Sequence, residues 1–124
     1  MQVDDSVRQA VIQLQSQQVE AHRQLSIVRS QLAQRERDQK LNTLTLREIE
    51  QLPRDSTRVG CYRAVGRMFV QESRNNIENT LKAKTKDSQE DVAVLTKKAK
   101  YLETEVATAQ TSLRDILQQA AANR

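Results

Sequence analysis

The chain has 124 residues, enough for one small domain, and its composition is more typical of solvated helices than of a compact globule. Aromatic residues make up 2% and charged residues 29%, so the large side chains that usually fill a globular core are scarce. The formal net charge is +4, but acidic residues interrupt the basic ones throughout, which argues against a nucleic-acid-binding face.

The cysteine count and the apolar runs bear on the cellular compartment. The single cysteine, Cys61, excludes an intrachain disulfide and fits a reducing compartment. The acidic residues 1–5 lack the apolar region of a signal peptide. The longest apolar run, residues 92–95, is far shorter than the roughly 20 residues that cross a membrane. We therefore expect a cytoplasmic protein without a membrane partner.

The first 40 residues carry a heptad repeat. Alternating steps of four and three residues give Val7, Val11, Leu14, Gln18, Ala21, Leu25, Val28 and Leu32. Seven of these eight positions are apolar, and such spacing keeps one apolar seam against a partner helix. The apolar pattern fails at Arg35 and Gln39, so the predicted N-terminal helix covers residues 1–40.

The middle segment, residues 41–72, holds the proline and both glycines. Thr45 is followed three residues later by Glu48, the spacing of a capping box, which predicts a separate short helix. This helix should end before Pro53, because the residue that precedes a proline disfavours helical geometry. A polar turn is expected at residues 54–57.

Two β-prone runs follow, at residues 59–65 and 68–70, and Gly66-Arg67 lies between them. This arrangement predicts a β-hairpin. A lone hairpin is marginal in water because its strand edges are unpaired, so we expect it to pair with hairpins of other chains. The predicted assembly residues are Val59, Cys61, Tyr62, Val65, Gly66, Met68, Phe69 and Val70.

Residues 73–124 predict a second long helix, for which Ser73 is a suitable N-cap. Nine consecutive heptad positions are apolar: Val92, Leu95, Ala99, Leu102, Val106, Ala109, Leu113, Ile116 and Ala120. Upstream, Ile77 and Leu81 begin a similar stripe, and the register then shifts across residues 84–88. A looser stretch is therefore expected near residues 82–86.

No group of residues in the sequence has the pattern of an active site. The only histidine, His22, follows the seam residue Ala21 and is expected on a solvated helix face. One histidine and one cysteine cannot supply the four ligands of a typical zinc site. Cys61 has no base beside it, and the glycines lack a phosphate-loop signature. We therefore expect no catalysis, cofactor or metal, and look for function in binding.

These elements predict a mainly α fold, a long antiparallel two-helix coiled coil joined by a short helix and one β-hairpin. Antiparallel helices would bring the two chain ends together, and apolar residues there could hold unfolded chains. The predicted client-binding residues are Val3, Val7, Val11, Ile12, Ile116, Leu117, Ala120 and Ala121. In the alternative interpretation, these residues only complete the coiled-coil seam.

The run Tyr62-Arg63-Ala64-Val65-Gly66-Arg67-Met68-Phe69 resembles β-class subunits of prefoldin. Glu48-Ile49 before it and Lys97-Lys98-Ala99-Lys100-Tyr101-Leu102-Glu103 after it extend the resemblance. The resemblance implies a single prefoldin-like domain over residues 1–124 within a hexamer of two α-class and four β-class subunits. Their hairpins would form a β-barrel platform.

The same resemblance implies an ATP-independent chaperone. It would capture unfolded proteins such as actin and tubulin and pass them to the cytosolic group II chaperonin. The alternative from the residues alone is a structural coiled-coil adaptor that joins folded partners. The hairpin separates the two, because an ordinary adaptor would not need it.

Overall fold

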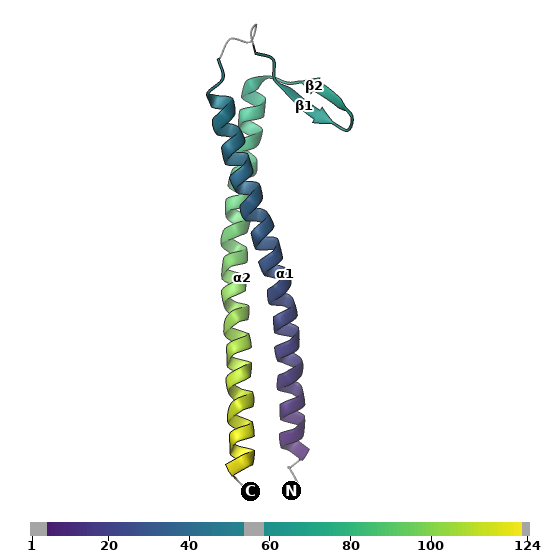
Figure 1. Ribbon diagram of the computed structural model, residues 1–124, viewed down its shortest axis with the longest axis vertical. Helices are drawn as coiled ribbons and strands as arrows, with labels where there is room; N and C mark the ends of the chain where they lie inside the picture. The colour runs from purple at the N-terminus through teal and green to yellow at the C-terminus, as the bar shows by residue number, and fades with distance from the viewer. Residues whose placement is uncertain (1–4, 54–58, 123–124) are drawn as a thin grey trace. The chain divides into compact units, whose positions relative to one another are not determined.

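The computed structural model describes residues 5–53 and 59–122 as two long helices and one hairpin (Figure 1). Helix α1 spans Asp5–Glu50 and α2 spans Arg74–Ala122; between them lie β1, Tyr62–Val65, and β2, Met68–Gln71. The chain divides into two compact units that are described separately below. Unit 1 contains Met1–Leu32 and Val94–Arg124, and unit 2 contains Ala33–Ala93.

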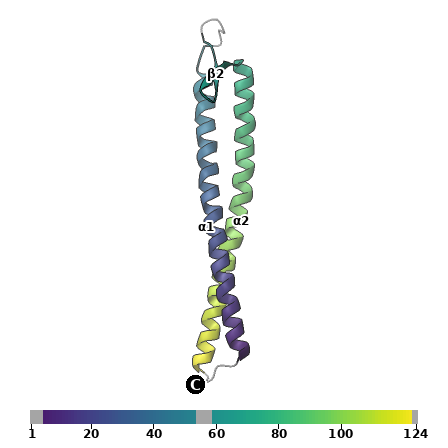
Figure 2. The same ribbon diagram turned by 90° about the vertical axis from the view of Figure 1, so that its right-hand side faces the viewer.

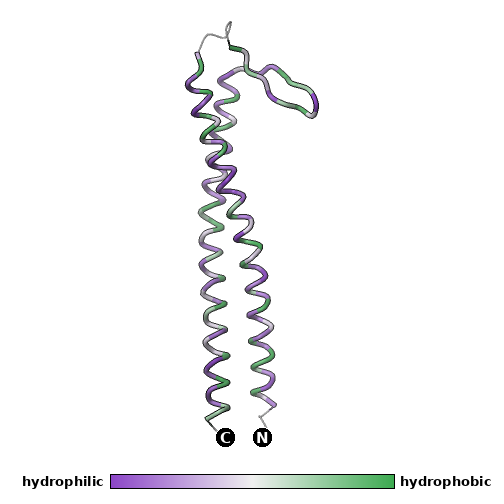
Figure 3. Tube along the Cα trace, in the orientation of Figure 1, coloured by the Kyte–Doolittle hydropathy of each residue, from purple (hydrophilic) through white to green (hydrophobic). Residues whose placement is uncertain are grey.

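Unit 1 is an antiparallel helix pair with an apolar seam. Both views show the N-terminal part of α1 alongside the C-terminal part of α2 (Figures 1 and 2), and hydrophobic residues recur along both helices (Figure 3). The buried cluster consists of Ala21, Leu25 and Val28 from α1 and Ala99, Leu102 and Val106 from α2. All six are predicted heptad positions, so the predicted seam is confirmed in this unit.

In unit 2 the heptad continues with a mixture of polar and apolar residues. On α1 the half-buried positions beyond Arg35 include Gln39, Asn42, Leu46 and Ile49, which keep the same alternating steps. On α2, Thr85 is half-buried and Ser88 is buried, both in register with Val92. The predicted register shift across residues 84–88 is therefore wrong, and α2 runs unbroken through residues 82–86. The seam keeps its heptad period here while polar residues replace apolar ones, so the positions of apolar residues alone do not reveal it.

The predicted short helix at Thr45 is also wrong, because α1 continues unbroken to Glu50. The Thr45 hydroxyl donates to the Leu41 carbonyl oxygen at 2.8 Å, a bond that a threonine makes inside a helix. Extending an existing helix needs no new nucleus, so continuation is favoured over a restart at Thr45. Pro53 follows the last turn, as expected, and the predicted turn at residues 54–57 lies outside the described residues.

The predicted hairpin is confirmed, with Tyr62 opposite Gln71 and Val65 opposite Met68. Its strands begin later than expected, at Tyr62, although the Glu72 amide donates to the Cys61 carbonyl oxygen at 3.0 Å. Gly66 has a φ of 61°, and no described non-glycine residue has a positive φ. A positive φ at the first turn residue alone is the pattern of a type II′ turn, which favours glycine there.

Ser73 caps α2 as predicted. Its hydroxyl accepts a hydrogen bond from the Asn76 amide at 3.2 Å, and its carbonyl oxygen accepts one from the Ile77 amide at 3.1 Å. The first bond satisfies one of the amides that lack a helical partner at the start of α2, and the second is the first bond of the helix itself. Within the described residues, neither helix has a stretch long and apolar enough to cross a membrane.

Candidate functional site

The hairpin exposes apolar side chains on both of its faces. Side chains alternate across a strand, so the register assigns Tyr62, Ala64, Phe69 and Gln71 to one face. The other face carries Arg63, Val65, Met68 and Val70. All eight residues are exposed, and Phe69 has 74% of its surface accessible. A contiguous exposed apolar surface is typical of an interface, because exposed apolar residues on monomeric proteins are usually scattered singly.

The strand edges of the hairpin point to the same conclusion. Within the described residues, β1 and β2 form a two-stranded sheet and pair only with each other. Each strand therefore has an outer edge with backbone groups that another strand could pair with. The structure places the predicted assembly residues Tyr62, Val65, Met68, Phe69 and Val70 on one small element.

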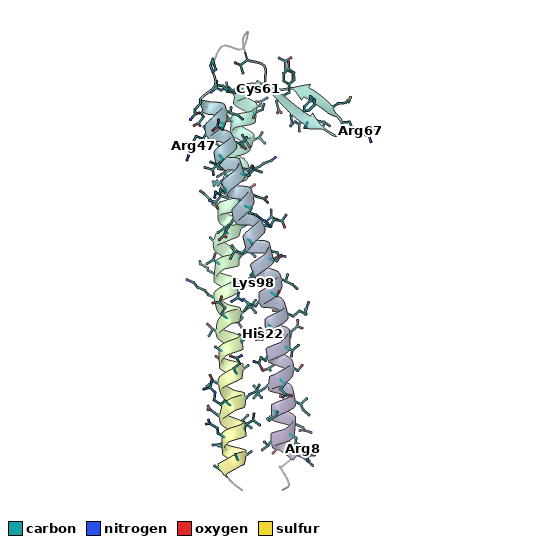
Figure 4. The ribbon with its side chains drawn as sticks, in the orientation of Figure 1. Arg8, His22, Arg47, Cys61, Arg67 and Lys98 are labelled. Carbon is teal, nitrogen blue, oxygen red and sulfur yellow. The ribbon has the colours of Figure 1, made fainter. Side chains whose placement is uncertain are left out.

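The residues at the base of the hairpin are less exposed than the strand residues. The predicted residues Val59 and Cys61 are half-buried there, and Arg67 lies at the opposite end, in the turn (Figure 4). A Cβ added to Gly60 would lie 3.1 Å from Cε2 and from the hydroxyl oxygen of Tyr62, so the glycine allows this aromatic side chain to approach the backbone. Arg63 and Glu72 form an ion pair at 3.1 Å.

The predicted client-binding residues differ in exposure. Ile12, Leu117 and Ala121 are exposed, whereas the other members that the structure describes are half-buried: Val7, Val11, Ile116 and Ala120. The helix ends that carry both groups lie at the same end of unit 1 (Figures 1 and 2). Val3 lies outside the described residues. The half-buried members continue the seam, and the three exposed ones are available to a partner.

Two hydrogen-bonded groups on the surface of unit 1 have shifted pKa values. Hydrogen bonds from Arg23 and Gln24, together with the charge of Arg23, lower the pKa of Glu20 from its usual 4.5. The Tyr101 hydroxyl donates to Glu105 at 2.6 Å, and this bond raises the pKa of the phenol above 10.0. Both sets of bonds join residues on one helix, and Glu20, Gln24, Tyr101 and Glu105 line an open groove between α1 and α2.

His22 is exposed on α1 (Figure 4). In residues 5–53 and 59–122, no three His, Cys, Asp or Glu side chains are placed to hold a metal ion.

The seam in unit 2 contains polar positions that the apolar pattern did not predict. Glu78 and Ser88 are buried on α2, where a coiled coil normally places apolar residues. Arg74 neutralises Glu78 through a hydrogen-bonded ion pair of 2.9 Å. Counting the heptad backwards from Val92 gives Ser88, Thr85, Leu81 and Glu78, so the spacing alone could have identified them.

Comparison with known proteins gives a consistent result. Residues 12–120 match the family described as "Prefoldin subunit". Prefoldin subunit 1 from Arabidopsis thaliana is 35% identical over 94% of this chain and 88% of its own length. Prefoldin subunit 1 from Danio rerio is 33% identical over 93% and 92%. The prefoldin beta subunit from Thermococcus strain KS-1 shares the fold, with a TM-score of 0.73 at 22% identity over 92% of this chain and 94% of that one.

Proposed function

Because the chain belongs to the prefoldin subunit family, whose members are components of a chaperone complex, we propose that it is a β-class subunit of a prefoldin hexamer. The hexamer contains two α-class and four β-class subunits. It captures unfolded proteins, including actin and tubulin, in the cytoplasm without using ATP. It then delivers them to the cytosolic group II chaperonin.

The exposed hairpin is the observation that carries this proposal. Both of its faces present large apolar side chains, and both strand edges are free within the described residues. A two-stranded sheet of this kind is marginal alone, and pairing with hairpins of other subunits satisfies the edges and covers the faces. The helix pair then remains available for clients.

The assembly step is tested by mixing the chain with α-class and β-class prefoldin subunits and measuring the native mass. We expect one defined hexamer. The double variant Met68→Ser with Phe69→Ser should not enter it, because both hairpin faces lose apolar area. Val19→Ser is the matched control, since Val19 is 69% exposed on α1 and outside the hairpin. Normal assembly of the hairpin variant would contradict the proposal.

Client capture is assigned to the end of unit 1 that carries Ile12, Leu117 and Ala121. Each exposed side chain offers little area, but several subunits in one hexamer would hold a client at many weak contacts. The polar residues between them keep each apolar patch small, which suits reversible binding.

This step is tested in the assembled hexamer with chemically unfolded actin. Ile12→Ser with Leu117→Ser should reduce suppression of actin aggregation while the hexamer mass stays the same. Val94→Ser is the control, because Val94 is similarly exposed on α2 and lies outside the client-binding set. Equal suppression by the double variant and the parent would show that clients bind elsewhere.

A further inference from the structure

Arg74 occupies an unusual position for an arginine. It is the first residue of α2, directly after the cap Ser73. The N-terminus of a helix carries partial positive charge and favours acidic side chains, so a cation there is unfavourable. The side chain is also largely buried, with 15% of its surface exposed. Residues that break local rules in this way usually have a role elsewhere in the structure.

The guanidinium of Arg74 links two parts of the chain. Its Nε donates to Oε1 of Glu78 at 2.9 Å, one turn further along α2. Its Nη1 donates to the carbonyl oxygens of Leu52 at 2.8 Å and Pro53 at 3.1 Å, just beyond the end of α1. Arginine suits this arrangement because its donors have a fixed planar geometry.

These bonds lie at the base of the hairpin. The ladder of β1 and β2 ends with the bond between Cys61 and Glu72, and only Ser73 separates Glu72 from Arg74. All eight strand residues are exposed, so side-chain packing on the helices does not hold the hairpin. Its direction therefore depends on the few residues at its base.

We propose that Arg74 is a positioning residue that holds the start of α2 against the end of α1 and thereby sets the direction of the hairpin for assembly. This inference rests on the proposed role of the hairpin in joining subunits. Glu78 orients the guanidinium, and the Leu52 and Pro53 carbonyl oxygens are the groups that it holds. A hairpin with a fixed direction assembles more readily, because less orientational freedom is lost on binding.

The test must separate positioning from stability, because removing Arg74 alone takes away the cation that pairs with the buried Glu78 carboxylate. The double variant Arg74→Glu with Glu78→Arg keeps one acid and one base at the two positions. It loses the donor to Leu52 and Pro53, because a carboxylate only accepts hydrogen bonds. A second variant, Arg74→Met with Glu78→Met, removes both charges and keeps the volume. Arg23→Met with Glu20→Met is the control, since that pair is exposed on α1.

Two measurements are made on the full chain. The first is the affinity for α-class and β-class prefoldin subunits, which should fall about tenfold or more in both Arg74 variants at unchanged helix content. The second is the distance distribution between spin labels at Glu50→Cys and Arg67→Cys in a Cys61→Ser background. It should broaden in both Arg74 variants and remain narrow in the control.

Parent-like affinity or a parent-like distance distribution in the charge-swapped variant would overturn the proposal. The hairpin variant Met68→Ser with Phe69→Ser separates this failure from a failure of the proposed function. If that variant fails to assemble while the Arg74 variants assemble normally, only the role of Arg74 is wrong. If all of these variants assemble normally, the hairpin itself is not the assembly element.

Discussion

Nη2 of Arg29 lies 3.0 Å from Oε1 of Glu103, so this ion pair joins α1 to α2 at the edge of the buried cluster in unit 1. Both side chains keep at least half of their surface exposed, at 60% and 50%. Water and salt screen such a pair, and its contribution to stability is small. The adjacent seam residues, Leu25 and Leu102, are buried and should contribute much more.

The first prediction compares these two kinds of contact. Leu25→Ala should lower the free energy of unfolding by about 2–4 kcal/mol, because it removes buried methyl groups and leaves a cavity. Arg29→Ala should change it by no more than about 1 kcal/mol. Urea unfolding followed by helical circular dichroism at one fixed protein concentration measures both. Equal losses in the two variants would mean that the apolar cluster does not dominate the stability of unit 1.

The second prediction concerns the polar seam of unit 2. Ser88→Leu should stabilise the helix pairing of residues 33–93 by about 1–2 kcal/mol, because it buries an apolar side chain at a seam position. Ser30→Leu makes the same change at an exposed position of α1 and gains only the helix propensity of leucine. Amide hydrogen exchange across unit 2 measures the difference between the two variants.

Leucine is larger than serine, so Ser88→Ala tests the same position without added volume. It should leave the exchange rates of unit 2 close to those of the parent. Slower exchange in Ser88→Leu with parent-like exchange in Ser88→Ala supports an under-packed polar seam. Faster exchange in both variants would instead show that the serine hydroxyl stabilises the pairing.

The sequence was sufficient to predict the features that depend on a single physical rule. The apolar seam of unit 1, the hairpin turn at Gly66 and the Ser73 cap all follow from local spacing and backbone preference, and the structure confirms them. The run from Tyr62 to Phe69 also indicated the family that the sequence comparison then confirmed. These features need no knowledge of distant contacts.

Prediction failed where two rules competed. Thr45 has the chemistry of an N-cap, but it lies within an established helix that is easier to continue than to restart. Ser88 and Glu78 occupy buried heptad positions but are polar, so the apolar pattern did not predict the register in this part of α2. The bonds from Arg74 to Leu52 and Pro53 join residues more than 20 positions apart, and no local pattern encodes them.

The third prediction tests the hairpin turn. Gly66 adopts a φ of 61°, and nothing lies within 4 Å of a Cβ added there, so only the backbone conformation opposes a substitution. Gly66→Ala should destabilise the hairpin by about 1–2 kcal/mol, and Gly66→Asn should cost less because asparagine tolerates this region. Titration of each variant with the other prefoldin subunits measures the loss of affinity. An alanine variant that binds as well as the asparagine variant would rule out backbone strain as the cause.

The last prediction concerns Tyr101. Its hydroxyl donates to the Glu105 carboxylate, and this bond raises the phenol pKa above 10.0. Since the folded pKa is the higher one, the stabilising contribution is fully present below pH 10.0 and is lost as pH rises through the folded pKa. Glu105→Ala removes the acceptor and its charge, so the pKa should fall toward its ordinary value.

Ultraviolet absorbance of the phenolate measures this pKa in a Tyr62→Phe background, where Tyr101 is the only tyrosine. Glu103→Ala is the matched control, because Glu103 lies on the same helix and pairs with Arg29 instead. It should leave the Tyr101 pKa at its raised value. If both variants lowered the pKa equally, the general negative charge of this part of α2 would be the cause, and the hydrogen bond from Tyr101 to Glu105 would not be.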